Sequence, residues 1–160
     1  MPATLPPFQA FLDQHREPVF GYLRAMVGPQ DAEDVFQETL ISALRAYHRM
    51  DGRHPRAWVL TIARRKAIDH FRARARRPEP RSDLPEPAAP PGGEIDAEIW
   101  KAVAELPAGQ RSAVALRYAT DLPYREIAAA LDCSDQAARR RVSDGLRALR
   151  AIIDREEITR

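Results

Sequence analysis

Apolar residues recur at intervals of three and four along most of the chain, which is the spacing of one helical face. The clearest case is the stretch 31–47, where apolar or small residues stand at 32, 35, 36, 39, 40, 43, 44 and 47. Its other face begins with acids and amides, and acids in a first turn suit the positive end of the helix dipole. Similar patterns predict helices over 8–26, where Pro18 kinks the helix or starts a second one, and over 55–76.

The stretch 77–93 contains six prolines and two glycines and has little to bury. We expect a flexible linker that reaches about 50 Å if it adopts polyproline II. Beyond it, shorter patterns predict helices over 94–106, 107–119, 123–131 and 134 to about 154. No β-type alternation of useful length appears. The sequence therefore predicts an all-α protein with two small domains, 1–76 and 94–160, joined by this linker.

The C-terminal part carries the pattern of a helix-turn-helix. Residues 123–142 read as a helix, a three-residue turn and a longer helix. Ala128 is small where two helices cross closely, and Ser134 is a good N-cap for the second helix. Asp132 stands where such turns often hold Gly, which is tolerable because Asp visits left-handed conformations more readily than most residues.

Helical geometry separates the arginines of the second helix by role. Ala138, Val142, Leu146, Leu149 and Ile153 form the predicted buried stripe. Gln136 and Arg140 face away from this stripe, and we predict that they read base edges, since Arg suits guanine and Gln suits adenine. We predict that the flanking basic residues contact phosphates; these are Arg139, Arg141 and Arg147. The alternative is an exposed basic helix of a bundle.

Charge is segregated along the chain although the net charge is only +2. Residues 1–52 hold four Arg and seven acids, whereas 53–81 hold ten Lys or Arg against two acids. This distribution suggests a protein-binding part and a polyanion-binding part, or simply a solvated basic helix. Aromatic residues interleave with Arg here, as on surfaces that bind single-stranded nucleic acid. The predicted contacts are Tyr47, His48, Arg49, Met50, His54, Trp58, Arg64, Arg65 and Arg72; Trp58 also fits a core position.

Several classes of protein are disfavoured. No run of about 18 apolar residues predicts a membrane span, and prolines and an acid interrupt the start where a signal peptide would be apolar, so we expect a cytoplasmic protein. The lone Cys133 cannot form an internal disulfide, and with the four scattered His it does not match zinc-ligand spacing. We find no phosphate-binding glycine loop, metal cluster or nucleophile constellation. Neither a cofactor nor an enzymatic activity is expected.

The chain resembles the extracytoplasmic-function (ECF) sigma factors of bacterial RNA polymerase. Three groups of residues carry the resemblance: Asp31 to Glu38; Trp58, Ile62-Ala63-Arg64, Ala67-Ile68-Asp69 and Arg72; and Leu106-Pro107, Gln110-Arg111, Leu116-Arg117, Tyr124, Glu126-Ile127-Ala128 and Leu131. It implies that Asp34, Gln37, Glu38 and Ser42 contact the clamp helices of the polymerase β′ subunit. By the same resemblance, the loop and basic helix after them capture the minus-ten promoter element, the helix-turn-helix reads the minus-thirty-five element, and an anti-sigma factor holds the protein inactive.

Departures from the family pattern leave alternatives open. Arg65 stands where many members have Asn, and Asp144 stands where a phosphate-binding Arg is usual. The stretch 136–141 also differs from the common recognition helix, so we expect an unusual minus-thirty-five preference or a weaker dependence on that element. Two alternative functions remain: a DNA-binding regulator that works without polymerase, and a decoy that sequesters an anti-sigma factor.

Overall fold

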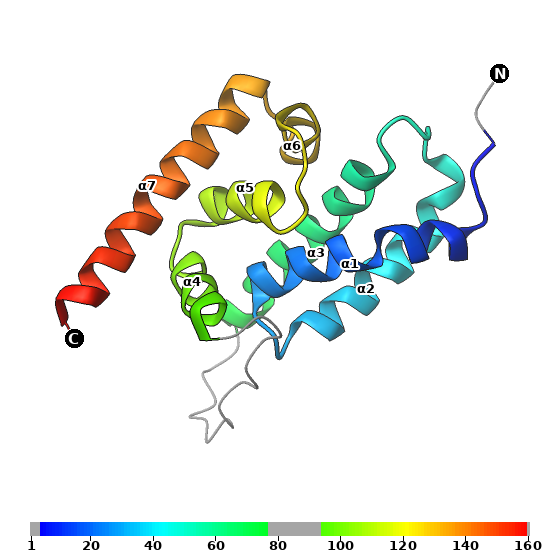
Figure 1. Ribbon diagram of the computed structural model, residues 1–160. Helices are drawn as coiled ribbons and strands as arrows, with labels where there is room; N and C mark the ends of the chain where they lie inside the picture. The colour runs from blue at the N-terminus through cyan, green and yellow to red at the C-terminus, as the bar shows by residue number, and fades with distance from the viewer. Residues whose placement is uncertain (1–3, 77–93, 160) are drawn as a thin grey trace.

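A computed structural model describes residues 4–76 and 94–159, and in these residues every regular element is a helix. The elements are α1 (Phe8–Val27), α2 (Ala32–Ala46), the 3₁₀ turn η1 (Tyr47–Arg49), α3 (Pro55–Arg76), α4 (Glu94–Ala104), α5 (Ala108–Tyr118), α6 (Tyr124–Leu131) and α7 (Asp135–Thr159). Figure 1 shows α1 to α3 grouped beside α4 to α7, with α7 along the outer edge. The all-α prediction is confirmed. The predicted linker, 77–93, lies outside the described residues.

Helices α1, α2 and α3 form what we call the N-terminal unit, each packing on the other two. Its interior contains Leu23, Val35, Phe36 and Leu60, all buried. Helix α1 continues through Pro18 as one element, so the predicted restart at this residue is wrong. Asp31 precedes α2, but its carboxylate does not cap the helix. It accepts hydrogen bonds from Arg74 Nη1 at 2.9 Å and pairs with His70 Nε2 at 3.0 Å, which ties the start of α2 to the end of α3.

Helices α4 to α7 form the C-terminal unit, in which α7 lies along α5 and α6. The close approach of α7 to α5 depends on Gly145, because a Cβ there would lie 2.6 Å from Val114 Cγ2. Between α6 and α7, Asp132 adopts the left-handed conformation predicted for it (φ 53°, ψ 52°). Ser134 caps α7 as predicted, since its Oγ accepts a hydrogen bond of 3.1 Å from the Ala137 N–H.

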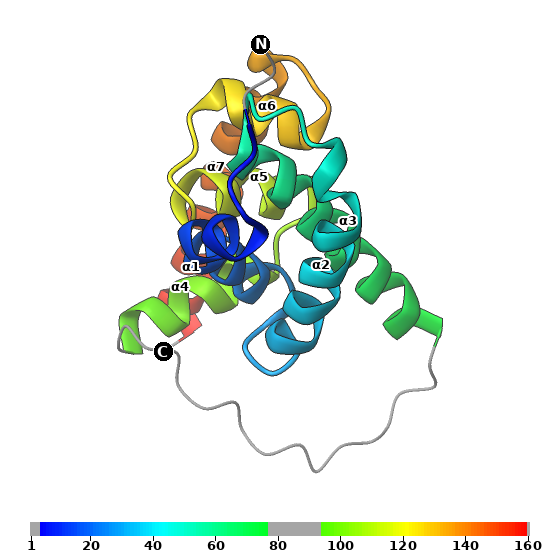
Figure 2. The same cartoon turned by 90° about the vertical axis from the view of Figure 1, so that its right-hand side faces the viewer.

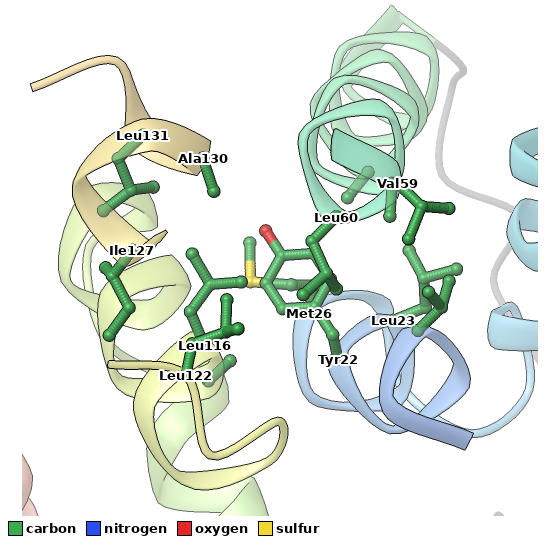
Figure 3. Close-up of a cluster of buried hydrophobic side chains, with 14 of the residues drawn as sticks. Tyr22, Leu23, Met26, Val59, Leu60, Leu116, Leu122, Ile127, Ala130 and Leu131 are labelled. Atoms are coloured by element: carbon green, nitrogen blue, oxygen red, sulfur yellow. The ribbon is translucent and has the colours of Figure 1, made fainter. Parts of the chain in front are cut away.

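The two units share one hydrophobic core rather than lying apart (Figure 3). Side chains of α1 and α3, including Tyr22, Met26 and Leu60, meet side chains from the C-terminal unit, including Leu116 and Ile127. Seen from the side in Figure 2, α1 and α3 both lie against the group formed by α5, α6 and α7. A smaller cluster inside the C-terminal unit joins α4, α5 and α7 through Val103, Leu106, Val114 and Ile152. Because this smaller cluster lies between α7 and the helices α4 and α5, the residues that α7 buries differ from the predicted ones.

The buried faces of α7 and α2 differ from the predicted ones because of how these helices pack. On α7, Ala138 and Val142 are buried as expected, but the stripe continues through Gly145 and Ile152, and Leu146 is 38% exposed. The contacts with α5 and α4 rotate the buried face toward these two residues. On α2, Leu44 is 56% exposed although the periodicity placed it on the inner face. Pro107 and Pro123 precede α5 and α6 as N-cap residues instead of occupying their first turns.

Candidate functional surfaces

The outer face of α2 brings together the residues predicted to bind polymerase. Asp34, Gln37 and Glu38 are exposed, and their spacing of three and four places them on one side of the helix. Ser42 lies half-buried at the edge of this side. Ile41 and Leu44 complete it with 51% and 56% exposure. The α2 outer face, as we call Asp34, Gln37, Glu38, Ile41 and Leu44, thus carries polar side chains toward the start of the helix and two exposed apolar side chains further along.

Sequence reasoning missed the apolar part of this face. Leu44 fitted the periodicity of the buried stripe, and Ile41 lies outside that stripe. An exposed pair of large aliphatic residues beside acids and amides is typical of a protein-binding surface, whose centre is apolar and whose rim is polar.

The residues predicted to take up DNA bases do not form one surface. Tyr47 and Trp58 pack in an aromatic cluster, with ring centroids 5.1 and 5.8 Å from that of Phe11. The Tyr47 hydroxyl donates a hydrogen bond to the Pro6 carbonyl. Met50 is 7% exposed and belongs to the core. In this conformation these three side chains hold the loop after α2 in place; Met50 is buried, and Tyr47 and Trp58 are half-buried.

The exposed members of the predicted set lie on two sides. His48 and Arg49 are exposed on η1, His54 is exposed just before α3, and Arg65 and Arg72 are exposed on α3. Arg72 follows Arg65 by seven positions, and the exposed Arg76 follows Arg72 by four. The three arginines therefore form a basic strip along the outside of α3, which also contains the exposed Asp69. Arg64 is half-buried away from this strip, near the hydroxyl of Tyr22 on α1. A strip of this kind suits a phosphate backbone.

The helix-turn-helix presents its recognition helix to solvent. Gln136, Arg139, Arg140 and Arg147 are exposed on α7, whereas Arg141 is half-buried at the flank. Gln136, Arg140 and Arg147 lie opposite the buried face that contains Ala138, Val142 and Gly145. This arrangement matches the side predicted to face the major groove, and it lies at the N-terminal end of the helix, where such helices contact bases.

Tyr124 organises two arginines that flank this helix. The Arg139 guanidinium lies 4.4 Å from the centre of the Tyr124 ring, and that of Arg117 lies 4.8 Å from the same centre. Arg117 is further fixed by a 2.9 Å hydrogen bond from Nη1 to the Leu122 carbonyl. Cation–π contacts reduce the number of rotamers open to a long side chain, so two positive charges are held in place before any ligand binds. The sequence pattern had indicated neither Arg117 nor Tyr124 as a binding residue.

Asp144 introduces a negative charge on the same helix. Its carboxylate lies 4.0 Å from the Arg140 Nε, one turn away, and both side chains are substantially exposed. An exposed pair at this distance contributes little to stability. The carboxylate lowers the positive potential beside Arg140.

Among the side chains that the structure describes, those of residues 4–76 and 98–159, we find no group of three His, Cys, Asp or Glu placed to hold a metal ion. Cys133, in the turn before α7, is a half-buried free thiol. Of the helices in the same two ranges, none is both long and apolar enough to cross a membrane.

These surfaces define a class: an all-helical DNA-binding protein with a helix-turn-helix, a basic helix and a separate protein-binding face. Residues 11–77 match the Sigma-70 region 2 family, and residues 96–149 match the Sigma-70, region 4 family. The chain is 30% identical to the ECF RNA polymerase sigma factor SigC of Mycobacterium tuberculosis, across 94% of this chain and 85% of that protein. It is 28% identical to the sigma factor SigX of Bacillus subtilis, across 94% and 87% of the two chains. The protein belongs to the ECF family of RNA polymerase sigma factors.

Solved structures agree with this assignment. The sigma factor RpoE of Bartonella quintana, in a complex with the anti-sigma factor NepR, is similar with a TM-score of 0.78 and 25% identity, across 94% of this chain and 98% of that one. CnrH, in a complex with the cytosolic domain of CnrY, shares the fold with a TM-score of 0.70 and 24% identity. The protein is an alternative sigma factor that directs RNA polymerase to promoter DNA.

Proposed function

We propose that residues 1–76 bind core polymerase and the minus-ten element, and that residues 94–160 bind the minus-thirty-five element. The α2 outer face supports the first role, because it presents acids, amides and two aliphatic side chains together on a helix anchored by its other side. Asp34, Gln37, Glu38 and Ser42 are the proposed contacts with the β′ clamp helices. Ile41 and Leu44 supply the apolar centre of the same contact.

The helix-turn-helix is the single observation that best supports promoter recognition. Gln136 and Arg140 project from the outer side of α7 and are the proposed readers of base edges. The phosphate contacts are Arg139, Arg141 and Arg147, to which the geometry adds Arg117, held on Tyr124 together with Arg139. The protein contributes recognition, and the chemistry of RNA synthesis belongs to the polymerase.

The proposed minus-ten surface consists of the basic strip on α3 and the exposed residues of η1. Arg65 and Arg72 would follow the DNA backbone, with His48 and Arg49 beside the opening strand. His54 is already exposed, whereas Tyr47, Met50, Trp58 and Arg64 become fully accessible to DNA only if the loop between α2 and α3 rearranges. A conformational change in this region is therefore part of the proposal.

An anti-sigma factor is the proposed regulator. Both solved relatives described above were captured with protein partners, and RpoE with a named anti-sigma factor. A polymerase-independent regulator would leave the α2 outer face without a role. A decoy for an anti-sigma factor needs no DNA contacts, and the preset arginines around Tyr124 argue against it.

Charge reversal on α2 tests the polymerase contact. We expect the Glu38→Lys variant to lose most of its affinity for core polymerase in a labelled-protein titration, because it places a like charge at a contact made by an acid. Glu17→Lys, which makes the same charge change at an exposed site on α1, should bind like wild type. Equal binding by both variants would exclude the α2 outer face as the docking site.

A further inference from the structure

We propose that the start of the described chain, residues 5–8, is a strap that covers the aromatic surface formed by Tyr47 and Trp58, and that an unstacked base of the opening promoter strand displaces it. The inference deepens the minus-ten role proposed above and rests on it. It concerns how this surface is covered in the free protein and what uncovers it.

The strap lies along the surface of the N-terminal unit. In Figures 1 and 2 the dark blue segment that leads into α1 passes beside η1, the turn that begins with Tyr47. Leu5 and Phe8 pack against the shared hydrophobic core, whereas Pro6 and Pro7 are exposed. Two side chains therefore anchor the strap, and the residues between them face solvent.

Tyr47 holds the strap through two contacts. Its hydroxyl donates a hydrogen bond to the Pro6 carbonyl, and its ring meets the Phe8 ring edge-on, with centroids 5.2 Å apart and planes at 71°. Edge-to-face pairs at this distance are favourable. Burial raises the pKa of Tyr47 above its usual value, so the hydroxyl remains a donor at neutral pH. The side chain that is predicted to meet a base is thus in contact with the protein's own chain.

The end of α1 that carries the strap is weakly stabilised. Prolines have no backbone N–H, so neither Pro6 nor Pro7 can donate a main-chain hydrogen bond to the loop. Pro7 also occupies the N-cap position of α1, where its side chain cannot accept a hydrogen bond from the first N–H groups. The first turn reads Phe-Gln-Ala-Phe, without an acid to suit the helix dipole. Phe8 can therefore leave Tyr47 when this turn frays, while the rest of α1 stays folded.

The surface that remains after Phe8 leaves rests on a fixed support. The Phe11 side chain is 3% exposed, and its ring lies 5.1 Å from that of Tyr47 and 5.8 Å from that of Trp58. The rings of Tyr47 and Trp58, both half-buried, lie 6.4 Å apart. Because burial anchors Phe11, it keeps the two rings in place without the strap.

An unstacked nucleobase suits this surface. Bases stack on aromatic side chains with little dependence on sequence, and Arg49, exposed two residues after Tyr47, can meet the phosphate of a captured nucleotide. A base that replaces Phe8 exchanges one aromatic contact for another, so the covered and uncovered states stay close in free energy and the strand can shift their balance. Bases stacked inside a duplex do not compete, so the strap yields only to a strand that is already opening.

Hydrogen exchange of the free, full-length protein tests the strap itself. The Phe11 N–H donates to the Pro7 carbonyl at 3.1 Å, so its exchange rate reports fraying of the first turn. Tyr47→Phe removes the hydrogen bond to Pro6 and keeps the ring. We expect exchange at Phe11 to become about fivefold faster, which is the usual effect of one hydrogen bond. Tyr118→Phe removes the same atom from an exposed side chain of α5 and should match wild type. Equal exchange in Tyr47→Phe and wild type would overturn the strap.

Promoter opening tests the competition with a base. Saturating sigma factor is mixed with core polymerase and fragmented genomic DNA of the source organism, and unstacked thymines are marked with permanganate and mapped by sequencing. The time to half-maximal reactivity should fall about fivefold with Tyr47→Phe, because the uncovered state is more populated. Phe8→Ala removes the competing ring and should act in the same direction. Phe20→Ala is the matched control, since it removes a ring that meets Phe36 edge-on at 5.4 Å on the same helix, and it should open promoters at the wild-type rate.

The outcomes separate the strap from the function on which it rests. Slower opening with Tyr47→Phe would make its hydroxyl a DNA contact and would overturn the proposal. Faster exchange at Phe11 with unchanged opening would do the same, because the strap would then not compete with the strand. No melted site with any of the proteins would instead refute the sigma function and leave the exchange result standing.

Discussion

Gly145 lies where α7 crosses α5, and replacing it with alanine tests how the recognition helix is held. An added Cβ would lie 2.6 Å from Val114 Cγ2, 3.3 Å from the Gln110 carbonyl oxygen and 3.4 Å from Gln110 Cβ. Favourable carbon–carbon contacts are about 3.5–4.0 Å long, so the nearest contact is about 1 Å too short. Val114 is 3% exposed and β-branched, so it has little freedom to turn away. The helices themselves must separate.

The expected free-energy change follows from two opposing effects. Overpacking a close helix contact costs about 1–3 kcal/mol, and the rigid neighbours place this site at the upper end. Gly to Ala within a helix gains about 1 kcal/mol in helix propensity. We therefore expect Gly145→Ala to lower the free energy of unfolding by about 2 kcal/mol. In the Val114→Ala background, where Cγ2 is gone, the same change should cost little.

Urea unfolding measures this change in the free energy of unfolding. The fluorescence of Trp100, which packs against the cluster that contains Val114, reports the transition. Gly109 on α5 is the matched control, because nothing lies within 4 Å of the position of its added Cβ. Gly109→Ala should leave stability unchanged or raise it slightly. If Gly145→Ala proved as stable as Gly109→Ala, the close approach of α7 to α5 would not exist in solution.

Further substitutions test the turn, a buried histidine and the recognition helix. Asp132→Gly should raise the free energy of unfolding by about 1 kcal/mol in urea titrations, because the left-handed conformation is strained for a residue with a Cβ; a loss would contradict the assigned geometry. Burial, with a smaller effect of Arg56, lowers the pKa of His15, so the fold favours the neutral ring; stability present above about pH 6.5 is lost as the pH falls below it, and His15→Leu should flatten that dependence in urea midpoints. Arg140→Ala should change which minus-thirty-five sequences are selected from a random pool, whereas Arg139→Ala should weaken all of them alike and reduce the salt slope by about one; an unchanged preference in Arg140→Ala would remove it as a base reader.

The helices were predictable because each carries its own periodicity and end signals. Ser134 and Asp132 fixed the turn before α7 through local chemistry, which does not depend on the rest of the chain. The exposed face of α7 followed from the rotation per residue. Leu44 and Leu146 were misplaced because periodicity shows that a face is apolar but not which neighbour covers it.

The interface between the units could not be read from the sequence. Tyr22 and Ser112 are 90 residues apart, and nothing local distinguishes a tyrosine that pairs across an interface from one in an ordinary core. The stacking of Arg117 and Arg139 on Tyr124 likewise joins three helices. Contacts of this range depend on the final packing, and the Pro-rich stretch 77–93 indicated two domains joined by a linker without indicating how they pack.

Transcript mapping tests the central claim most directly. Purified protein, sigma-free core polymerase and fragmented genomic DNA of the source organism are combined, and the 5′ ends of the transcripts are sequenced. The account predicts start sites that cluster downstream of one shared two-part motif and that disappear with the Glu38→Lys variant. No specific starts together with no binding to core polymerase would contradict it.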